Sequence, residues 1–279
     1  TVDADAAANA RTLTLNADGA FTYTPGTNFS GVDSFTYRAS DGVTNSSAVS
    51  VTLCVAPAGK LFADDLTRSG SSDPLAPWQV ASGTWSITNG LLNGASVLQS
   101  YGRAYLANSW SNYWVQARLQ FLAGAFGGGV GGRLDPETGA HYAAWIYPEG
   151  SPGGAATVGL VKFQTWTSFA YNGAGLVPMS QVSVPSVGTN WHSLRLAFEG
   201  SSIGVYYDDN LVMSVTDTEA QPYMSGGISL EMWTGATPYL MAADDVLVGP
   251  TALSQTITFG PLTNKTYGDL PFAVSATAS

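Results

Sequence analysis

A run of short alternating segments between Leu61 and Pro250 constrains the fold more than any other feature of the sequence. In residues 113–121, apolar side chains occupy the odd positions, which is the period of a β-strand with one buried face. Further segments of this kind follow at Phe126–Leu134, His141–Tyr147, Val158–Trp166, His192–Phe198, Ile203–Tyr207, Leu211–Thr216 and Ile228–Trp233. We find no long segment with the apolar period of a helix. The pattern predicts an all-β sandwich or barrel.

The few charged residues and the negative net charge argue against some classes of partner. Charged residues make up 11% of the 279 residues and the formal net charge is −10, so little in the chain could neutralise the phosphates of a nucleic acid or an anionic membrane. No apolar run reaches the ~20 residues of a membrane span. The composition is typical of a secreted β-protein. The single cysteine, Cys54, permits no intrachain disulfide, and its place in an alternating segment predicts a buried, inert thiol.

The residues before the middle stretch have the pattern of strands and tight turns. A turn signal at 16–19 joins Thr12–Leu15 to Ala20–Pro25, which predicts a β-hairpin. The run LTLNADGAFTYTPGTNFSGVDSFTYRASDG closely resembles the bacterial cadherin-like tandem repeats of large adhesins and secreted glycanases. The resemblance implies that residues 1–56 are a partial Ig/cadherin-like β-sandwich module with a spacer role.

The other flank, residues 251–279, contains the dipeptide Tyr267-Gly268. Its sequence, TALSQTITFGPLTNKTYGDLPFAVSATAS, resembles the opening of the mainly-β bacterial repeat named for its Tyr-Gly signature, which is another extracellular spacer. Because the chain starts and stops within repeat-like segments, we interpret it as a fragment of a longer modular protein. Two spacers around one middle domain indicate a secreted or cell-surface location.

The middle domain, residues 57–250, holds all eight tryptophans and both histidines. Its segments FADDLTR, SGTWSITNGLL, GGGVGGRL, HYAAWIY, NWHSLRLAFEGSSIGVYYDDNLVMSV, GGISLEMW and ADDVLV are similar to the concanavalin-like, laminin G-like jelly roll. The resemblance implies a jelly-roll β-sandwich whose first and last strands are neighbours. That superfamily contains carbohydrate-binding modules, glycanases and lyases, so the fold alone does not choose among these functions.

Neighbouring first and last strands would bring Asp64-Asp65 close to Asp244-Asp245. Converging carboxylates repel one another unless a cation lies between them, and calcium takes six to eight oxygen ligands. Adjacent residues of a strand face opposite sides, so we predict that one carboxylate of each pair, Asp64 and Asp245, binds a structural calcium ion. The alternative is that these residues are solvated strand ends. One cysteine and two separated histidines make zinc a poor candidate.

Glycines mark a candidate ligand face. Gly127, Gly129 and Gly131 leave one side of a strand without side chains, and such a strip suits the floor of a groove for sugar rings. The residues predicted to bind ligand from this strand and others are Arg133, His141, Trp145, Tyr147, Lys162, Trp166, Glu231 and Trp233. The alternative is that the tryptophans belong to the core and the glycines give them room. A register error of one residue would exchange the two faces of a strand.

Catalysis has weak support in the sequence. Glycosidases use two carboxylates roughly 5–10 Å apart, whereas Glu231 is the one strand carboxylate that plausibly faces the predicted groove. We therefore predict a non-catalytic carbohydrate-binding or adhesion module that holds a polysaccharide by stacking on tryptophan and by polar contacts. The first alternative is a glycoside hydrolase or polysaccharide lyase in which Glu231 is catalytic. The second is a structural or protein-adhesion stalk whose partners are other surface proteins.

Overall fold

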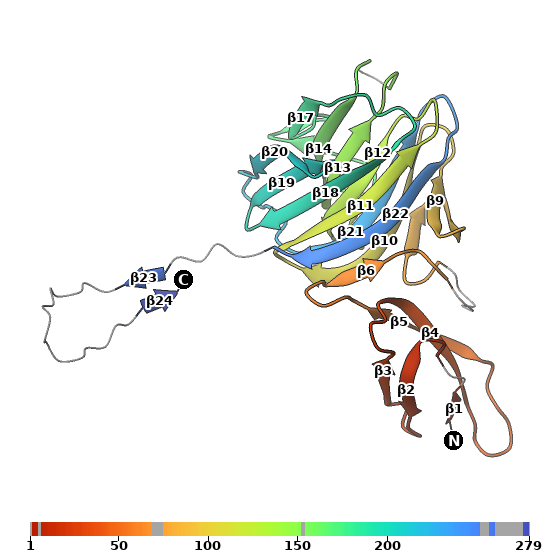
Figure 1. Ribbon diagram of the computed structural model, residues 1–279. Coiled ribbons are helices and arrows are strands. Elements are labelled where there is room, and N and C mark those ends of the chain that lie inside the picture. The colour runs from red at the N-terminus through yellow and green to blue at the C-terminus, as the bar shows by residue number, and fades with distance from the viewer. Residues whose placement is uncertain are drawn as a thin grey trace, which may run out of the picture.

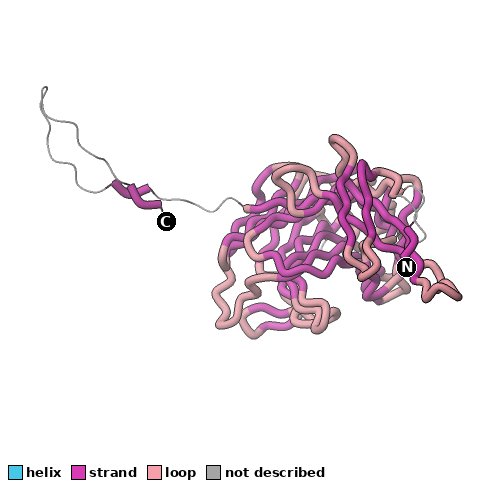
Figure 2. The backbone as a smooth tube through the Cα atoms, turned by 90° about the horizontal axis from the view of Figure 1, so that it is seen from below, coloured by secondary structure: helices cyan, strands magenta, loops and turns pink. Residues whose placement is uncertain are grey.

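The computed structural model describes residues 2–4, 7–68, 75–151, 154–251, 257–259 and 276–278, and every long regular element in them is a β-strand (Figure 1, Figure 2). The predicted all-β class is confirmed. The described part of the chain contains no helix with the length and hydropathy needed to cross a membrane.

The first module combines a three-stranded sheet with a hairpin. Its strands are β1 (Val2–Ala4), β2 (Ala10–Leu15), β3 (Phe21–Pro25), β4 (Gly31–Ala39) and β5 (Val49–Val55). The sheet has the order β1-β4-β5, and β2 pairs with β3, so the predicted hairpin is confirmed. The module adjoins the sandwich near its first strand, β6 (Phe62–Asp64) (Figure 1).

Cys54 lies in β5, at the edge of this three-stranded sheet. Its side chain is exposed, so the prediction of a buried thiol is wrong. Alternation along a strand does not say which side is buried, and on β5 the cysteine takes the exposed side.

The sandwich consists of two antiparallel sheets. The first sheet has seven strands in the spatial order β17 (Ser180–Ser183), β14 (Thr157–Phe163), β13 (His141–Tyr147), β12 (Gly128–Leu134), β21 (Gly226–Thr234), β10 (Ser100–Trp110) and β7 (Gln79–Ser82). The second has the order β20 (Asn210–Thr216), β19 (Ser202–Tyr207), β18 (Trp191–Glu199), β11 (Tyr113–Phe121), β22 (Met241–Pro250), β9 (Leu91–Ala95) and β8 (Thr84–Thr88), with β6 paired to β22. The predicted jelly-roll sandwich is confirmed.

Two short pairs of strands complete the described elements. β15 (Ala170–Tyr171) and β16 (Ala174–Gly175) form a small hairpin that follows β14 in the chain. β23 (Ile257–Phe259) pairs with β24 (Ala276–Ala278). The Tyr267-Gly268 signature lies outside the described residues, so the second spacer repeat stays a prediction.

The core lies between the two sheets. All odd positions of β11, from Tyr113 to Phe121, are buried there, as the alternating pattern predicts. Burying each large apolar side chain stabilises the fold by about 1.5–3 kcal/mol. The hydroxyl of Tyr113 donates to the carbonyl of Gly227, 2.8 Å away, and so keeps its polar atom paired inside the core.

The first and last strands of the sandwich lie side by side. In the pairing of β6 with β22, Asp64 is opposite Val246 and Phe62 is opposite Val248. The neighbourhood implied by the jelly-roll resemblance is therefore confirmed.

A second layer of side chains covers the side of the seven-stranded sheet that faces away from the core, here called the outer face. Alternate residues of β10 and β21 point to it in register, with Tyr101 opposite Trp233 and Arg103 opposite Glu231. Tyr101 and Trp233 pack against a small cluster of buried apolar side chains that includes Trp145 of β13 and is separate from the main core. The candidate site is built on this face.

Candidate functional site

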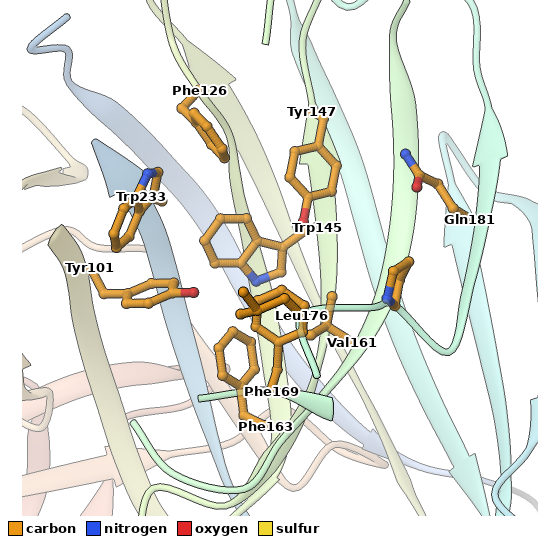
Figure 3. A pocket seen from close by; sticks show the side chains of 11 residues that line it. Tyr101, Phe126, Trp145, Tyr147, Val161, Phe163, Phe169, Leu176, Gln181 and Trp233 are labelled. Atoms are coloured by element: carbon orange, nitrogen blue, oxygen red, sulfur yellow. The ribbon is translucent and has the colours of Figure 1, made fainter. Parts of the chain in front are cut away.

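A pocket with a volume of about 250 Å³ opens on the outer face of the seven-stranded sheet (Figure 3). Aromatic and aliphatic side chains dominate its lining. The lining residues are Tyr101, Phe126, Trp145, Tyr147, Val161, Phe163, Phe169, Leu176, Pro178, Gln181 and Trp233. We call it the aromatic pocket. Three predicted ligand residues, Trp145, Tyr147 and Trp233, converge in it, although their role in binding stays a prediction.

Contacts between rings hold the aromatic pocket in shape. Trp145 is only 2% exposed and forms the floor, whereas Tyr101, Tyr147 and Trp233 are partly exposed and form the walls (Figure 3). The ring centroids of Tyr101 and Trp233 are 4.6 Å apart, and those of Trp145 and Tyr147 are 5.9 Å apart. Ring pairs at such distances add about 0.5–1.5 kcal/mol each. The aromatic surface is therefore formed before any ligand arrives.

Few polar atoms line the aromatic pocket. The indole Nε1 of Trp145 is buried and has no hydrogen-bond partner among the described residues. Burial raises the pKa of the Tyr101 and Tyr147 hydroxyls above their usual value, so both stay neutral and able to donate. Gln181 of β17 adds an amide at the rim. The pocket can thus offer a small number of directed donors on an apolar surface.

Beside the aromatic pocket lies a group of buried polar side chains, Arg103, His141, Ser229 and Glu231, here called the buried ion cluster. Arg103 Nε donates to Glu231 Oε2 at 3.0 Å, and His141 Nε2 lies 2.9 Å from Glu231 Oε1. Ser229 Oγ donates to the same Oε1 at 3.0 Å. These contacts tie β10, β13 and β21 together beneath the outer face.

The carboxylate of Glu231 is held in its ionised form. Burial opposes ionisation, but the neighbouring His141 and Arg103, with their hydrogen bonds, outweigh it and lower the pKa of Glu231 to about 2. Both oxygens are occupied, and the side chain is fully buried. Glu231 therefore stabilises the sheet as a paired anion at neutral pH.

Arg103 connects the buried ion cluster to the aromatic pocket. Its guanidinium carbon lies 4.1 Å from the ring centre of Tyr101 and 4.5 Å from that of Phe163, two residues that also line the pocket. Its two terminal nitrogens are buried and have no hydrogen-bond partner among the described residues, so the aromatic faces are their nearest stabilising contacts. The buried guanidinium of Arg103 thus packs against two of the rings that line the aromatic pocket.

The glycine strip predicted as a groove floor is covered by side chains at Gly131. A side chain at Gly131 would collide with the Ser229 hydroxyl and the Glu231 carboxylate, so the glycine makes room for the buried ion cluster. Gly129 pairs with Trp145 and Glu231 on its two neighbouring strands. Sugar rings cannot lie against Gly131, because polar side chains already occupy that end of the strip.

Arg133 was predicted on the ligand face and is found elsewhere. The pairing of β12 with β21 shifts between Gly132 and Leu134, and Arg133 itself has a φ of +52°. This bulge breaks the alternation and directs the guanidinium to the carbonyls of Ser111 and Tyr223, with the closest contact at 2.6 Å. Arg133 ties loops together at the edge of the core and does not line the aromatic pocket.

Lys162 also points away from the outer face. It is opposite Tyr142 of β13, whose ring belongs to the core. Its Nζ pairs with Asp217 and Glu219, each 2.7 Å away. The prediction that Lys162 shares the ligand face is wrong, because β14 turns the opposite set of residues outward.

Trp166 lies beyond the end of β14, which stops at Phe163 and not at Trp166 as predicted. Its ring packs near Tyr105, with centroids 5.5 Å apart, and near His141 at 6.3 Å. Trp166 therefore covers the buried ion cluster. His141 is likewise fully buried in that cluster, where it stacks on Phe163.

The carboxylates predicted to bind calcium do not fit a shared ion. Asp64 is buried and accepts hydrogen bonds from both terminal nitrogens of Arg68 at 2.8 Å and from the indole of Trp78 at 2.9 Å. Donors thus fill the positions that a cation would need. Asp245, with its side chain 51% exposed, pairs with Arg118 at 3.1 Å. Among the described residues, no group of three or more histidine, cysteine or acidic side chains could hold a metal.

Several residues of the site were not foreseen. Tyr101, Phe126 and Phe163 line the aromatic pocket, and Arg103 anchors the buried ion cluster. One signal was available, because Tyr101, Arg103 and Tyr105 recur at the period of a strand. Phe126 was placed in a predicted strand, but β12 begins only at Gly128, and Phe169 lies in a loop without such a pattern.

Comparison with known proteins finds a family match in the first part of the chain and similar solved structures for a larger part of it. Residues 1–57 match the family model of the bacterial cadherin-like domain. Comparison with curated proteins gives no match. The structural neighbours include a β-glucanase of Bacillus licheniformis, which has 16% identity and a TM-score of 0.51 over 70% of this chain and 100% of that one.

Two further solved structures share the fold. One comes from work on endo-acting O-glycanases of the human gut microbiota that initiate mucin breakdown, with 13% identity and a TM-score of 0.53 over 69% of this chain and 100% of that one. The other is a protein of unknown function with a galectin-like fold from Bacillus subtilis, with 11% identity and a TM-score of 0.52 over 70% of this chain and 98% of that one. At these identities the likeness is one of fold.

Proposed function

We propose that the middle domain is a carbohydrate-binding module that holds a glycan in the aromatic pocket. The observation that carries the proposal is the convergence of Tyr101, Trp145, Tyr147 and Trp233 around a preformed cavity on the outer face. The flat apolar side of a pyranose ring packs well on such rings, while directed donors fix its orientation.

Two similarities to known proteins, one of fold and one of sequence, support this proposal. The glucanase and the mucin O-glycanases that share the fold act on glycans, as their names state. The bacterial cadherin-like match at residues 1–57 supports a modular protein that is secreted or displayed at the cell surface, where the first module serves as a spacer. Polysaccharides or glycans of that environment are the partners that we propose.

Hydrolysis in the same place has less support. A general acid must carry a proton near neutral pH, whereas the pKa of Glu231 is lowered to about 2. Both oxygens of that carboxylate are already paired, and the described residues that line the aromatic pocket include no acidic side chain. The geometry therefore favours binding over cleavage of the glycan.

Affinity electrophoresis of the full chain, through gels that each contain one polysaccharide, tests the proposal. We expect one polymer to retard the protein and to remain intact, and we expect Trp233→Ala to abolish the retardation. Trp114→Ala is the matched control, because Trp114 lies on the second sheet and points away from the core. Shortened polymer would instead indicate a glycanase. No retardation in any gel, with and without calcium, would contradict the proposal and favour a structural or protein-adhesion role.

A further inference from the structure

The chemistry of the aromatic pocket restricts the kind of sugar that it can hold. None of its described lining residues is charged, and its polar side-chain groups are those of Tyr101, Trp145, Tyr147, Gln181 and Trp233. Most of the lining is aromatic or aliphatic, so burying an apolar group of the ligand against it is favourable, whereas burying a sugar hydroxyl without a partner is costly. A well-matched ligand therefore brings an apolar group of its own into the pocket.

The buried donor on the pocket floor indicates what accompanies that apolar group. An indole N–H can only donate, and the Nε1 of Trp145 has no acceptor among the described residues. A ligand oxygen that accepts without also donating, such as a carbonyl oxygen, would satisfy it. Figure 3 shows the indole nitrogen on the edge of the Trp145 ring, and the ring centroids of Trp145 and Phe163 are 6.5 Å apart. The acceptor and the apolar group thus belong close together on the ligand.

We propose that the aromatic pocket selects a sugar that carries an acetamido group, and this inference rests on the proposed carbohydrate-binding function. Because Trp145 Nε1 is enclosed by its neighbours in the unliganded pocket, the acetamido carbonyl accepts its hydrogen bond only after a side chain at the rim moves aside. The methyl group then packs against Val161, Phe163 and Phe169. The neutral hydroxyls of Tyr101 and Tyr147 remain for the hydroxyls of the sugar ring.

Leu176 supplies an adaptable edge for this pocket. Its side chain is 74% exposed, although it lines the cavity, and its backbone has a φ of +60°. A bulky residue rarely adopts this left-handed conformation, and such outliers gather at ligand sites. Because solvent surrounds most of the side chain, it can shift to admit the acetamido group and then cover it.

The size of the cavity limits how much of a glycan enters it. The cavity volume of about 250 Å³ lies just below the roughly 300–1,000 Å³ of pockets that take drug-sized ligands. We therefore expect one sugar residue to occupy the pocket, and the rest of the glycan to lie outside it.

Titration calorimetry of the full chain with matched oligosaccharides tests the inference. Chitotriose and cellotriose have the same β-1,4 linkage and differ in their acetamido groups, and methyl N-acetylgalactosaminide and methyl galactoside form a second matched pair. In at least one pair we expect the acetamido sugar to bind about ten-fold more tightly or better. Trp145→Phe keeps an aromatic floor without the N–H, and should bring the two members of that pair within about two-fold.

The outcomes separate the inference from the function on which it rests. Equal affinity within both pairs would overturn the acetamido inference and leave glycan binding intact. The same holds if none of the four sugars binds while a polysaccharide still retards the protein in a gel. If nothing binds in calorimetry or in gels, the proposed function fails as well. The comparison within each pair uses the unaltered protein, so it stands even if Trp145→Phe does not fold.

Discussion

The aromatic pocket and the buried ion cluster are built from the same strands, two residues apart. On β10, Tyr101 lines the pocket and Arg103 belongs to the cluster, and on β21 the same step leads from Trp233 to Glu231. The cluster is closed, because its carboxylate is fully buried and paired through both oxygens. The pocket is partly exposed and keeps an unpaired donor. One half of the outer face is thus suited to hold the sheet together, and the other half to bind a ligand.

Removing the cluster's carboxylate should have the largest effect. Glu231→Ala leaves Arg103 as a buried cation without its counterion, which costs about 3–5 kcal/mol of the free energy of unfolding. Urea denaturation followed by tryptophan fluorescence measures this loss. Glu137→Ala, which removes an exposed glutamate, should change stability by less than about 0.5 kcal/mol. If the two variants are equally stable, the cluster does not hold the sheet.

Low pH should lower the free energy of unfolding through the buried ion cluster. The pKa of Glu231 is about 2 in the folded protein against an ordinary value of 4.5, so its contribution is complete above pH 4.5 and is lost as the pH falls toward 2. This group alone should cost roughly 2 kcal/mol between pH 7 and pH 3. Glu231→Gln lacks the titration, and its unfolding free energy should fall by correspondingly less over that range. Parallel pH profiles for the two proteins would show that other carboxylates dominate.

The pocket half should respond in affinity and much less in stability. Trp233→Ala removes a partly exposed wall next to Tyr101, and we expect glycan affinity to fall at least ten-fold, equal to about 1.4 kcal/mol. Calorimetry with the polysaccharide identified in gels measures the change, and urea denaturation shows whether the fold is intact. If Trp233→Ala binds the glycan as tightly as the control Trp114→Ala does, Trp233 does not contact the ligand.

The alternation of apolar and polar residues predicted most of the fold and part of the candidate site. It placed the buried side of β11 correctly and grouped Trp145 with Tyr147 on one face. It failed at Arg133, because a bulge with a positive φ reverses the side chain, and nothing in the sequence marks that bulge. It also failed at Lys162, since a strand alone does not say which of its two sides meets the core.

The period-two pattern could not predict contacts made by irregular segments. The indole of Trp78 and the guanidinium of Arg68 both bind Asp64, and they lie on irregular segments that carry no periodic signal. Acidic residues at neighbouring strand ends therefore suggested calcium, whereas the structure gives Asp64 a cationic side chain as its partner. The adjacency of β6 and β22 was predicted correctly, and only the chemistry at that junction differed.

Replacing Trp166 tests whether the aromatic pocket and the buried ion cluster have separate roles. Of the changes considered, it should have the smallest effect. Its ring lies over Tyr105 and His141, on the side of the buried ion cluster, and it does not line the aromatic pocket. Trp166→Ala should therefore change glycan affinity by less than about two-fold. It should lower the free energy of unfolding by about 1 kcal/mol, because a partly exposed ring loses its packing over the cluster.

The same calorimetry and urea denaturation, run beside Trp233→Ala, decide the question. If Trp166→Ala weakens glycan binding as much as Trp233→Ala does, ligand contacts extend over the buried ion cluster, and the two halves form one longer binding surface. If instead stability falls while affinity holds, the ring at 166 serves as the cover that keeps water from the Arg103–Glu231 pair. Proteins need such covers because a buried ion pair offsets its desolvation only when water stays out.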